Sequence, residues 1–148
     1  MPPLHPSYRS LLALAVTAVG CAGVPSGRLF FEGTGAHGHY SGALSPTDCA
    51  AKVSRDGSGA WQVGTVTFFA GGAVNYVSLA PGGAVSVSVV DPPVQVALSA
   101  PTCQAYDVRT WIDAARSVHA VVDVDCNLPG DAQVRGRMAS DNCLPLQN

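Results

Sequence analysis

The chain has 148 residues, enough for one ordinary domain, and 12% of them are charged against 47% that are hydrophobic. The hydrophobic residues are scattered among Gly, Ser and Thr and form no repeated blocks of about twenty, which excludes a polytopic membrane protein. The formal net charge of −2 becomes −3 when a leader carrying the positive charge of Arg9 is removed, and no cluster of Lys or Arg remains, so we expect no nucleic-acid partner.

An apolar segment of ten residues, 10–19, follows a short polar start that ends in Arg9. This is the pattern of a signal peptide, because ten residues are too few to cross about 30 Å of hydrocarbon as a helix. The segment runs directly into Ala18-Val19-Gly20-Cys21.

These four residues resemble the lipobox of bacterial lipoproteins, in which a small residue precedes a cysteine. The resemblance covers the leader only, and Ala18 stands where the family usually has Leu. It implies that the leader 1–20 is cut off and that Cys21 carries a diacylglyceryl group, with acyl chains such as palmitate. Two or three such chains hold a protein on a bilayer almost permanently, since each buried CH2 contributes about 0.8 kcal/mol. The alternative is an ordinary cut near Ala22 or Gly23 that releases a secreted protein.

The expected organisation is therefore a leader at 1–20, a flexible tether at 21–27 and a single β domain at 28–148. With the lipid anchor as its membrane partner, the domain would face the periplasm or the exterior of a bacterial cell envelope. That compartment permits disulfides.

Setting Cys21 aside leaves four cysteines, an even number that predicts two disulfides. The short separation across a predicted hairpin favours Cys103 with Cys126, which leaves Cys49 with Cys143; the other two connectivities stay open. The chain has no C-x-x-C spacing, so structural zinc and thioredoxin-like redox chemistry are not favoured.

From residue 28 onward, short segments alternate between apolar and polar residues and are separated by Gly, Pro, Asp and Asn, the pattern of antiparallel strands. Their number and spacing predict an all-β fold, a small antiparallel sandwich or barrel of about eight to nine strands. The nine predicted strands are 28–32, 37–44, 60–70, 73–79, 84–90, 94–99, 104–112, 117–126 and 132–140.

The seventh and eighth of these strands predict a hairpin. Bringing their apolar faces together puts Tyr106 opposite Val124. In that register Cys103 misses Cys126 by one residue, so a disulfide between them requires a β-bulge near the start of the seventh strand.

Two histidines, His37 and His39, stand two residues apart and would share one side of a strand as two ligands of a zinc or copper site. The local sequence lacks a third ligand, which His119, from a distant part of the chain, could supply in space. Since a metal site needs its full set of ligands, two solvent-facing histidines are the favoured interpretation.

Two carboxylates, Asp123 and Asp125, share one face of a predicted strand, and the hairpin register places Asp107 across from Asp123. Three carboxylates in one patch could attract calcium, but the loop spacing of a known calcium motif is absent. A solvated outer face, with its repulsion softened by Arg109, is favoured.

No G-x-S-x-G elbow or phosphate-binding glycine loop is present, so we predict no catalytic residues and no cofactor. The favoured function is a non-enzymatic interaction or structural module of the cell envelope, whose protein or small-molecule partner the sequence does not specify. The alternative is a β-sandwich or barrel that binds a small apolar ligand or a glycan. The aromatic residues that could line such a site are Trp61, Trp111, Tyr40, Tyr76 and Tyr106.

Overall fold

The computed structural model describes residues 23–71 and 74–146; the predicted leader and Cys21 lie outside the described residues. Within these ranges the chain is almost entirely strand, with one short 3-10 helix, and no helix there is long and apolar enough to cross a membrane. The elements are β1 (Ser26–Gly35), β2 (Gly38–Leu44), β3 (Asp48–Arg55), β4 (Trp61–Ala70), β5 (Asn75–Leu79), β6 (Val85–Val89), β7 (Val94–Leu98), η1 (Ala100–Thr102), β8 (Cys103–Ile112), β9 (Val118–Leu128) and β10 (Ala132–Leu146).

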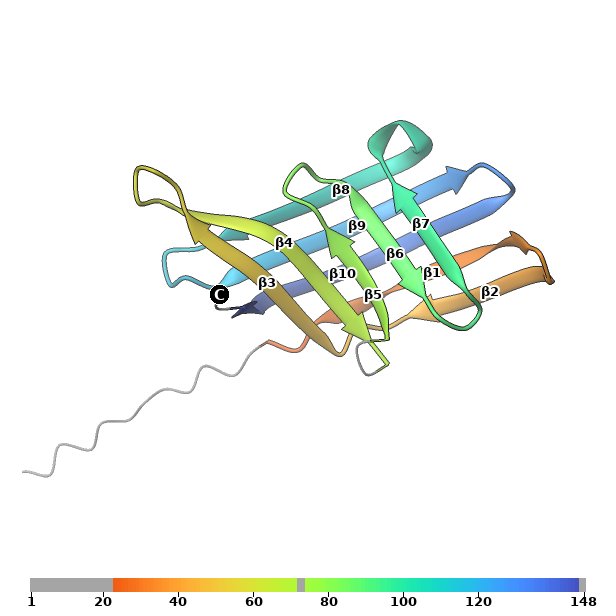
Figure 1. The fold of residues 1–148 in the computed structure, drawn as a ribbon, viewed down its shortest axis with the longest axis horizontal. Helices are drawn as coiled ribbons and strands as arrows, with labels where there is room; N and C mark the ends of the chain where they lie inside the picture. Colours follow the sequence, from red (N-terminus) through yellow and green to blue (C-terminus); the bar gives the residue numbers. More distant parts are fainter. Residues whose placement is uncertain (1–22, 72–73, 147–148) are drawn as a thin grey trace, which may run out of the picture.

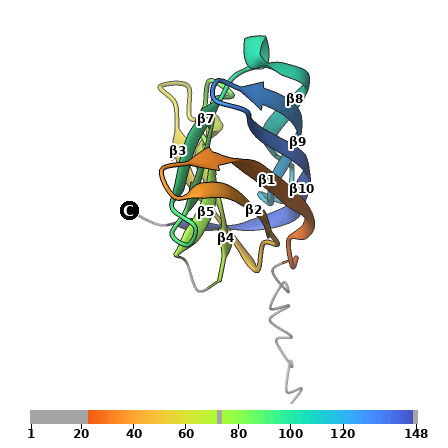
Figure 2. The ribbon, with the colours of Figure 1, turned by 90° about the vertical axis from the view of Figure 1, so that its right-hand side faces the viewer.

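The ten strands form one continuous, curled sheet that folds over into two layers. We call β2-β1-β10-β9-β8 the first sheet and β3-β4-β5-β6-β7 the second sheet; within each, neighbouring strands are antiparallel. Figure 1 shows the strands of the second sheet crossing those of the first, and Figure 2 shows the two layers side by side. The prediction of an all-β fold with two disulfides is confirmed.

Strand β10 joins the two sheets. Its first part pairs with β1 and β9 in the first sheet, and its register shifts between Ser140 and Cys143. Beyond the shift, residues 144–146 pair in parallel with β3 of the second sheet. A bulge bends a strand, and bent strands that change sheets make the corners of crossed β-sandwiches. The disulfide between Cys49 and Cys143 lies at this corner.

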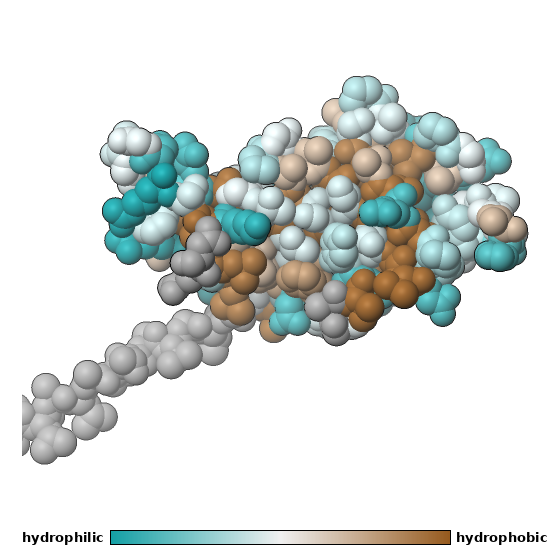
Figure 3. Space-filling view, viewed as in Figure 1, coloured by the Kyte–Doolittle hydropathy of each residue, from teal (hydrophilic) through white to brown (hydrophobic). Residues whose placement is uncertain are grey.

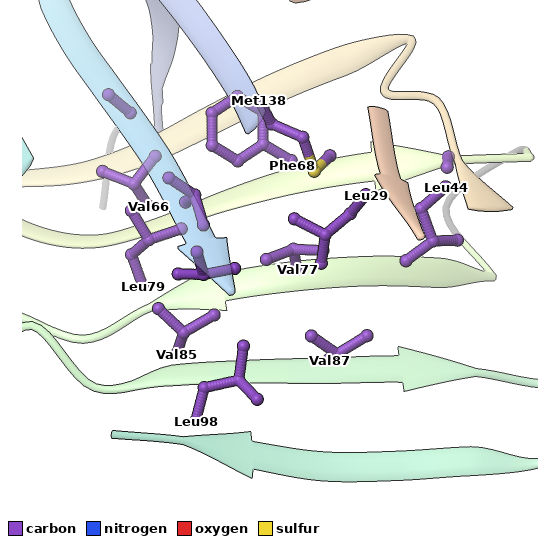
Figure 4. Packing of buried hydrophobic residues seen from close by; sticks show 14 of the residues in the cluster. Leu29, Leu44, Val66, Phe68, Val77, Leu79, Val85, Val87, Leu98 and Met138 are labelled. Carbon is purple, nitrogen blue, oxygen red and sulfur yellow. The ribbon is translucent and has the colours of Figure 1, made fainter. Parts of the chain in front are cut away.

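The core lies between the two layers and follows from the alternation of apolar residues. Val85, Val87 and Val89 are buried along β6, as their period of two requires. Figure 4 shows Met138 of the first sheet beside Phe68 of the second, and these side chains are 1% and 0% exposed. Burying side chains of this size stabilises a fold by about 1.5–3 kcal/mol each.

The structure confirms the predicted hairpin of β8 and β9 in detail. Tyr106 pairs with Val124, and Cys103 lies opposite Cys126 because the register shifts between Cys103 and Ala105. Both disulfides have the favoured connectivity, Cys103 with Cys126 and Cys49 with Cys143. Since disulfides form and persist in oxidising surroundings, they indicate an extracytoplasmic location.

The count of nine strands was one too low. The sequence pattern missed β3, and it ended the last strand at residue 140 although β10 continues to Leu146. Strand β1 also begins at Ser26, inside the segment predicted as tether. The pairing of β3 with the end of β10 is parallel, an addition to the predicted antiparallel arrangement.

Candidate binding surface at the tryptophan end

Two hairpin turns, β3–β4 and β8–β9, lie at the same end of the molecule (Figure 1). Both turns have the same hydrogen bonds: the aspartate that opens the turn donates its N–H to the residue four positions later and accepts an N–H from the third. In β3–β4 the aspartate is Asp56, and in β8–β9 it is Asp113. Figure 3 shows the β3–β4 hairpin as a hydrophilic projection from this end.

Trp61, at the start of β4, lies between the two turns and is 36% exposed. The sheet register places it opposite Arg55, whose guanidinium carbon is 4.4 Å from the centre of the indole ring. Arg116 reaches the same ring from the β8–β9 turn, at 5.7 Å. Both distances are within the range of an attractive cation–π interaction.

Trp111, on the outer face of β8, forms a second cluster beside the first. It is 41% exposed and stacks on its cross-strand partner His119, with ring centres 4.9 Å apart and planes 3° from parallel. The guanidinium carbon of Arg109 is 5.9 Å from the Trp111 ring centre.

Asp113 connects the two clusters, since it lies in the same turn as Arg116 and contacts His119. Its Oδ2 is 2.8 Å from His119 Nε2, and its Oδ1 accepts the N–H of Ser117 at 2.9 Å. The hydrogen bond from His119, followed by that from Ser117, lowers the pKa of Asp113 below its ordinary value. The second ring nitrogen of His119 is 3.6 Å from Asp141.

We call this surface the tryptophan end. Its side chains are flat aromatic rings, guanidinium groups and one hydrogen-bonded carboxylate, which suit recognition of an anion, a sugar face or a protein surface. They comprise Arg55, Trp61, Trp111, Asp113, Arg116 and His119.

A groove of about 450 Å³ adjoins the tryptophan end at Trp111. It runs between the β5–β6 turn and strand β8, and its lining is Ala80, Pro81, Gly82, Gly83, Val108, Arg109, Thr110 and Trp111. The Tyr106 hydroxyl holds one side of the groove, because it donates to the carbonyl of Gly83 or to that of Leu98. Burial raises the pKa of Tyr106, so this hydroxyl stays a donor near neutral pH.

The structure does not bring the three histidines together. His37 lies in the β1–β2 turn and His39 in β2, so the pair does not lie on one strand, and both are exposed. His119 is at the other end of the first sheet: β9 runs from His119 to Asn127, about 26 Å, before it reaches the end that carries the β1–β2 turn.

The predicted carboxylate patch is present, and arginines lie beside its carboxylates. Asp107 pairs across the strands with Asp123 as expected. Arg109 is 2.8 Å from Asp107, and Arg137, which the sequence did not suggest, is 3.3 Å from Asp123. Asp125 lies opposite another arginine on β10. Across residues 23–71 and 74–146, no three His, Cys, Asp or Glu side chains are grouped closely enough to hold a metal ion.

Two of the five aromatic residues proposed from the sequence, Trp61 and Trp111, belong to the tryptophan end. Tyr40 lies over Gly33 and packs against the core. Sequence reasoning missed Arg55 and Arg116, because only the folded sheets bring them to one indole ring. The signal that could have drawn attention to them is the repeated turn pattern, an aspartate followed by small residues.

Comparison with known protein families, curated proteins and solved structures finds no match to this chain.

Proposed function

We propose that this protein is a lipid-anchored lipoprotein of the bacterial cell envelope, and that its β domain is a non-enzymatic module that binds a partner through the tryptophan end. The lipobox-like residues 18–21 support the anchor, and the two disulfides agree with the compartment.

The observation that carries the binding proposal is the pairing of two exposed tryptophans with arginine guanidiniums at one end of the fold. Tryptophan and arginine are enriched among the residues that dominate binding energy at protein interfaces. A tryptophan that serves only to pack the core is normally covered, whereas Trp61 and Trp111 keep 36% and 41% of their surface exposed.

The start of the described chain supports a short link to the membrane. Gly23 lies beside Asn142, near the corner where β10 changes sheets. Gly23 is two positions after Cys21, with one residue between them, and such a link spans at most about 7 Å. An acylated Cys21 would thus hold this corner at the bilayer surface, where Val24 and Leu144 are 81% and 53% exposed.

The anchor is tested by intact-mass analysis of the membrane fraction from the native host. We expect a mature chain that begins at Cys21 with added acyl mass, and a Cys21→Ser chain that loses the added mass and leaves the membrane fraction. An unmodified chain that begins at another residue contradicts the anchor.

The binding surface is tested separately, by placing a photo-crosslinking amino acid at position 61 of the full chain in living cells. Val90, which is 58% exposed in the β6–β7 turn, is the matched control position. We expect a discrete crosslinked product from position 61 that position 90 does not give. Equal crosslinking from both positions contradicts a role for the tryptophan end.

A second candidate function is the binding of a glycan or a small apolar ligand in the groove beside Trp111. The groove volume of about 450 Å³ favours it, since ligand pockets commonly measure about 300–1,000 Å³. A glycan array distinguishes the two: saturable binding that Trp111→Ala abolishes and Trp61→Ala preserves assigns the groove as the site.

A further inference from the structure

Arg116 occupies a backbone position that favours glycine. Three hairpins of this fold, β3–β4, β5–β6 and β8–β9, close with the same pair of backbone hydrogen bonds. In each, the fourth residue of the turn has a positive φ: +85° at Gly59, +84° at Gly83 and +66° at Arg116. Two of the three turns use glycine, which adopts this conformation without strain. The backbone of any residue with a side chain is strained there.

The strained position gives Arg116 its contact with Trp61. From there the guanidinium lies over the indole ring that Arg55 also covers. An interaction of a single exposed cation with a ring is weak, so the fold gains little stability from this arrangement. Strained residues concentrate at functional sites, where the surrounding structure maintains them.

The charges of the two arginines are not neutralised by the neighbouring carboxylates. Neither Arg55 nor Arg116 forms an ion pair within the described part of the chain. The carboxylate of Asp56 accepts hydrogen bonds from Ser58, residue 60 and Gln62, and Asp113 is held by His119 and Ser117. Arg55 and Arg116 are also exposed. Their guanidinium donors are therefore accessible to a ligand.

We propose that Arg55, Trp61 and Arg116 bind a phosphate ester, carried by a lipid headgroup or by a small soluble molecule. Guanidinium donors match phosphate oxygens in geometry, and two positive charges at one ring attract both the charge of about −1.5 to −2 of a phosphate monoester and the charge of about −1 of a phosphate diester near pH 7. This proposal rests on the proposed function in that it names the ligand chemistry of the tryptophan end.

Binding is measured on the full chain carrying Cys21→Ser, so that acyl chains do not dominate binding to vesicles. With Trp111→Phe added, Trp61 is the single tryptophan, and its fluorescence reports directly on the site. Glycerol phosphate is titrated at constant ionic strength set with chloride. Sedimentation is then measured with vesicles of phosphatidylcholine alone and with added phosphatidylglycerol.

We expect saturable binding of glycerol phosphate, of phosphatidylglycerol vesicles, or of both. Glycerol phosphate alone assigns a soluble phosphate ester as the ligand. Vesicles bound only when they contain phosphatidylglycerol assign the lipid headgroup. Binding of neither probe overturns the proposal, whatever the mass analysis shows for Cys21.

The variants separate a built site from general charge attraction. Arg116→Gly and Arg55→Gln should each weaken binding by about ten- to a hundredfold, the loss expected for charge-assisted hydrogen bonds. Arg28→Gln is the matched control, since Arg28 is also an arginine beside an exposed aromatic ring, Phe30, and should leave binding unchanged. Equal losses in all three variants overturn the proposal.

Thermal unfolding supplies a second readout for Arg116→Gly. Because glycine fits the positive φ, the midpoint should rise by a few degrees while binding is lost. A fall in the midpoint would instead show that Arg116 serves the stability of the turn, which overturns the assignment to a ligand.

Discussion

Asp113 illustrates how one side chain can fix both a turn and an aromatic stack. Its Oδ1 accepts the N–H of Ser117 inside the β8–β9 turn, while its Oδ2 contacts His119, on which Trp111 stacks. The orientation of the Trp111 ring therefore depends on a carboxylate that must be ionised to accept both hydrogen bonds fully.

This arrangement predicts a pH dependence at the acid end. The pKa of Asp113 is lower in the folded protein, mainly because of the hydrogen bond from His119. The ionised carboxylate therefore stabilises the fold at any pH above the unfolded pKa. This stabilisation is lost as the pH falls through the lower folded pKa. The charged groups that face it are His119, Asp141 beyond the imidazole, and Arg116 in its own turn. We expect Asp113→Asn to be less stable than the wild type at neutral pH, and the two midpoints to converge as the pH falls from about 4 through the lower folded pKa.

Thermal unfolding followed by circular dichroism across this pH range checks the prediction. Asp91→Asn, which removes an exposed carboxylate from the β6–β7 turn, changes the net charge equally and is the control. A difference between Asp113→Asn and wild type that persists at the lowest pH would refute the role of the ionised carboxylate.

Gly136 allows β1 and β10 to approach each other closely. It lies within β10 at a φ of +133°, and a Cβ atom there would overlap the carbonyl oxygen of Arg28 on β1. We expect Gly136→Ala to lower the free energy of unfolding by about 3 kcal/mol or more, since strain and overlap add. Gly38→Ala also has a positive φ, +101°, but open space around it, and should cost about 1 kcal/mol in the same urea titration. Similar losses for both would mean that backbone conformation alone matters.

The sequence predicted residue contacts correctly where the alternation of side chains along two paired strands decides which residues lie opposite each other. Asp107 and Asp123 were placed across from one another because the apolar faces of two strands had to coincide. Arg137 could not be assigned to Asp123, since nothing in the local sequence says which strand lies on the other side of β9.

At the scale of elements, β10 determines the architecture. Its 15 residues are far more than the usual five or six of a strand, because its first part belongs to the first sheet and its last residues to the second. The disulfide at Cys143 ties the turning point of β10 to β3, and it closes a chain segment of 94 residues. The disulfide of Cys103 and Cys126 closes only 23 residues within one hairpin.

The two disulfides should therefore contribute unequally. In the chain-entropy description, closing 94 residues stabilises a fold by about 4.7 kcal/mol and closing 23 residues by about 3.4 kcal/mol. We expect the double variant of Cys49 and Cys143 to alanine to lose about 1 kcal/mol more stability than that of Cys103 and Cys126. Urea denaturation of the two variants measures the difference, and the opposite order would show that local strand pairing outweighs loop closure.

The missed strand β3 shows where local patterns fail. Its sequence, DCAAKVSR, has small and charged residues in place of alternating β-branched ones, so it does not read as a strand. It is a strand because β4 pairs along one side and the end of β10 along part of the other. Asp141 and Asn142 lie beyond the predicted end of the last strand, at the bulge where β10 continues.

At the scale of the whole molecule, the sequence predicted the strand class and most strand positions, but not how the layers close. Hairpins are local, and turn residues such as Asp91, Pro92 and Pro93 mark them. The choice between sandwich and barrel depends on the contact of β10 with β3, which joins segments more than ninety residues apart, roughly the separation of the cysteines at that corner.

This closure predicts that the two sheets unfold together. They share one core, in which Met138 of the first sheet lies beside Phe68 of the second, and β10 is a member of both (Figure 4). Neither sheet keeps a covered apolar face without the other, so partial unfolding would expose the core of the part that remains. A single transition is therefore expected for the protein with its disulfides intact.

The two tryptophans allow each sheet to be followed separately. In Trp111→Phe, the fluorescence of Trp61 reports on the second sheet, and in Trp61→Phe that of Trp111 reports on the first. Within each variant, we expect the fluorescence midpoint in urea to coincide with the midpoint from far-ultraviolet circular dichroism. If Trp61 changes at a lower urea concentration than the dichroism does, the second sheet opens first, and β10 does not couple the two layers. Coinciding midpoints in both variants would mean that the corner at Cys143 transmits stability from one sheet to the other, because it is the one place where a strand of the described residues belongs to both sheets.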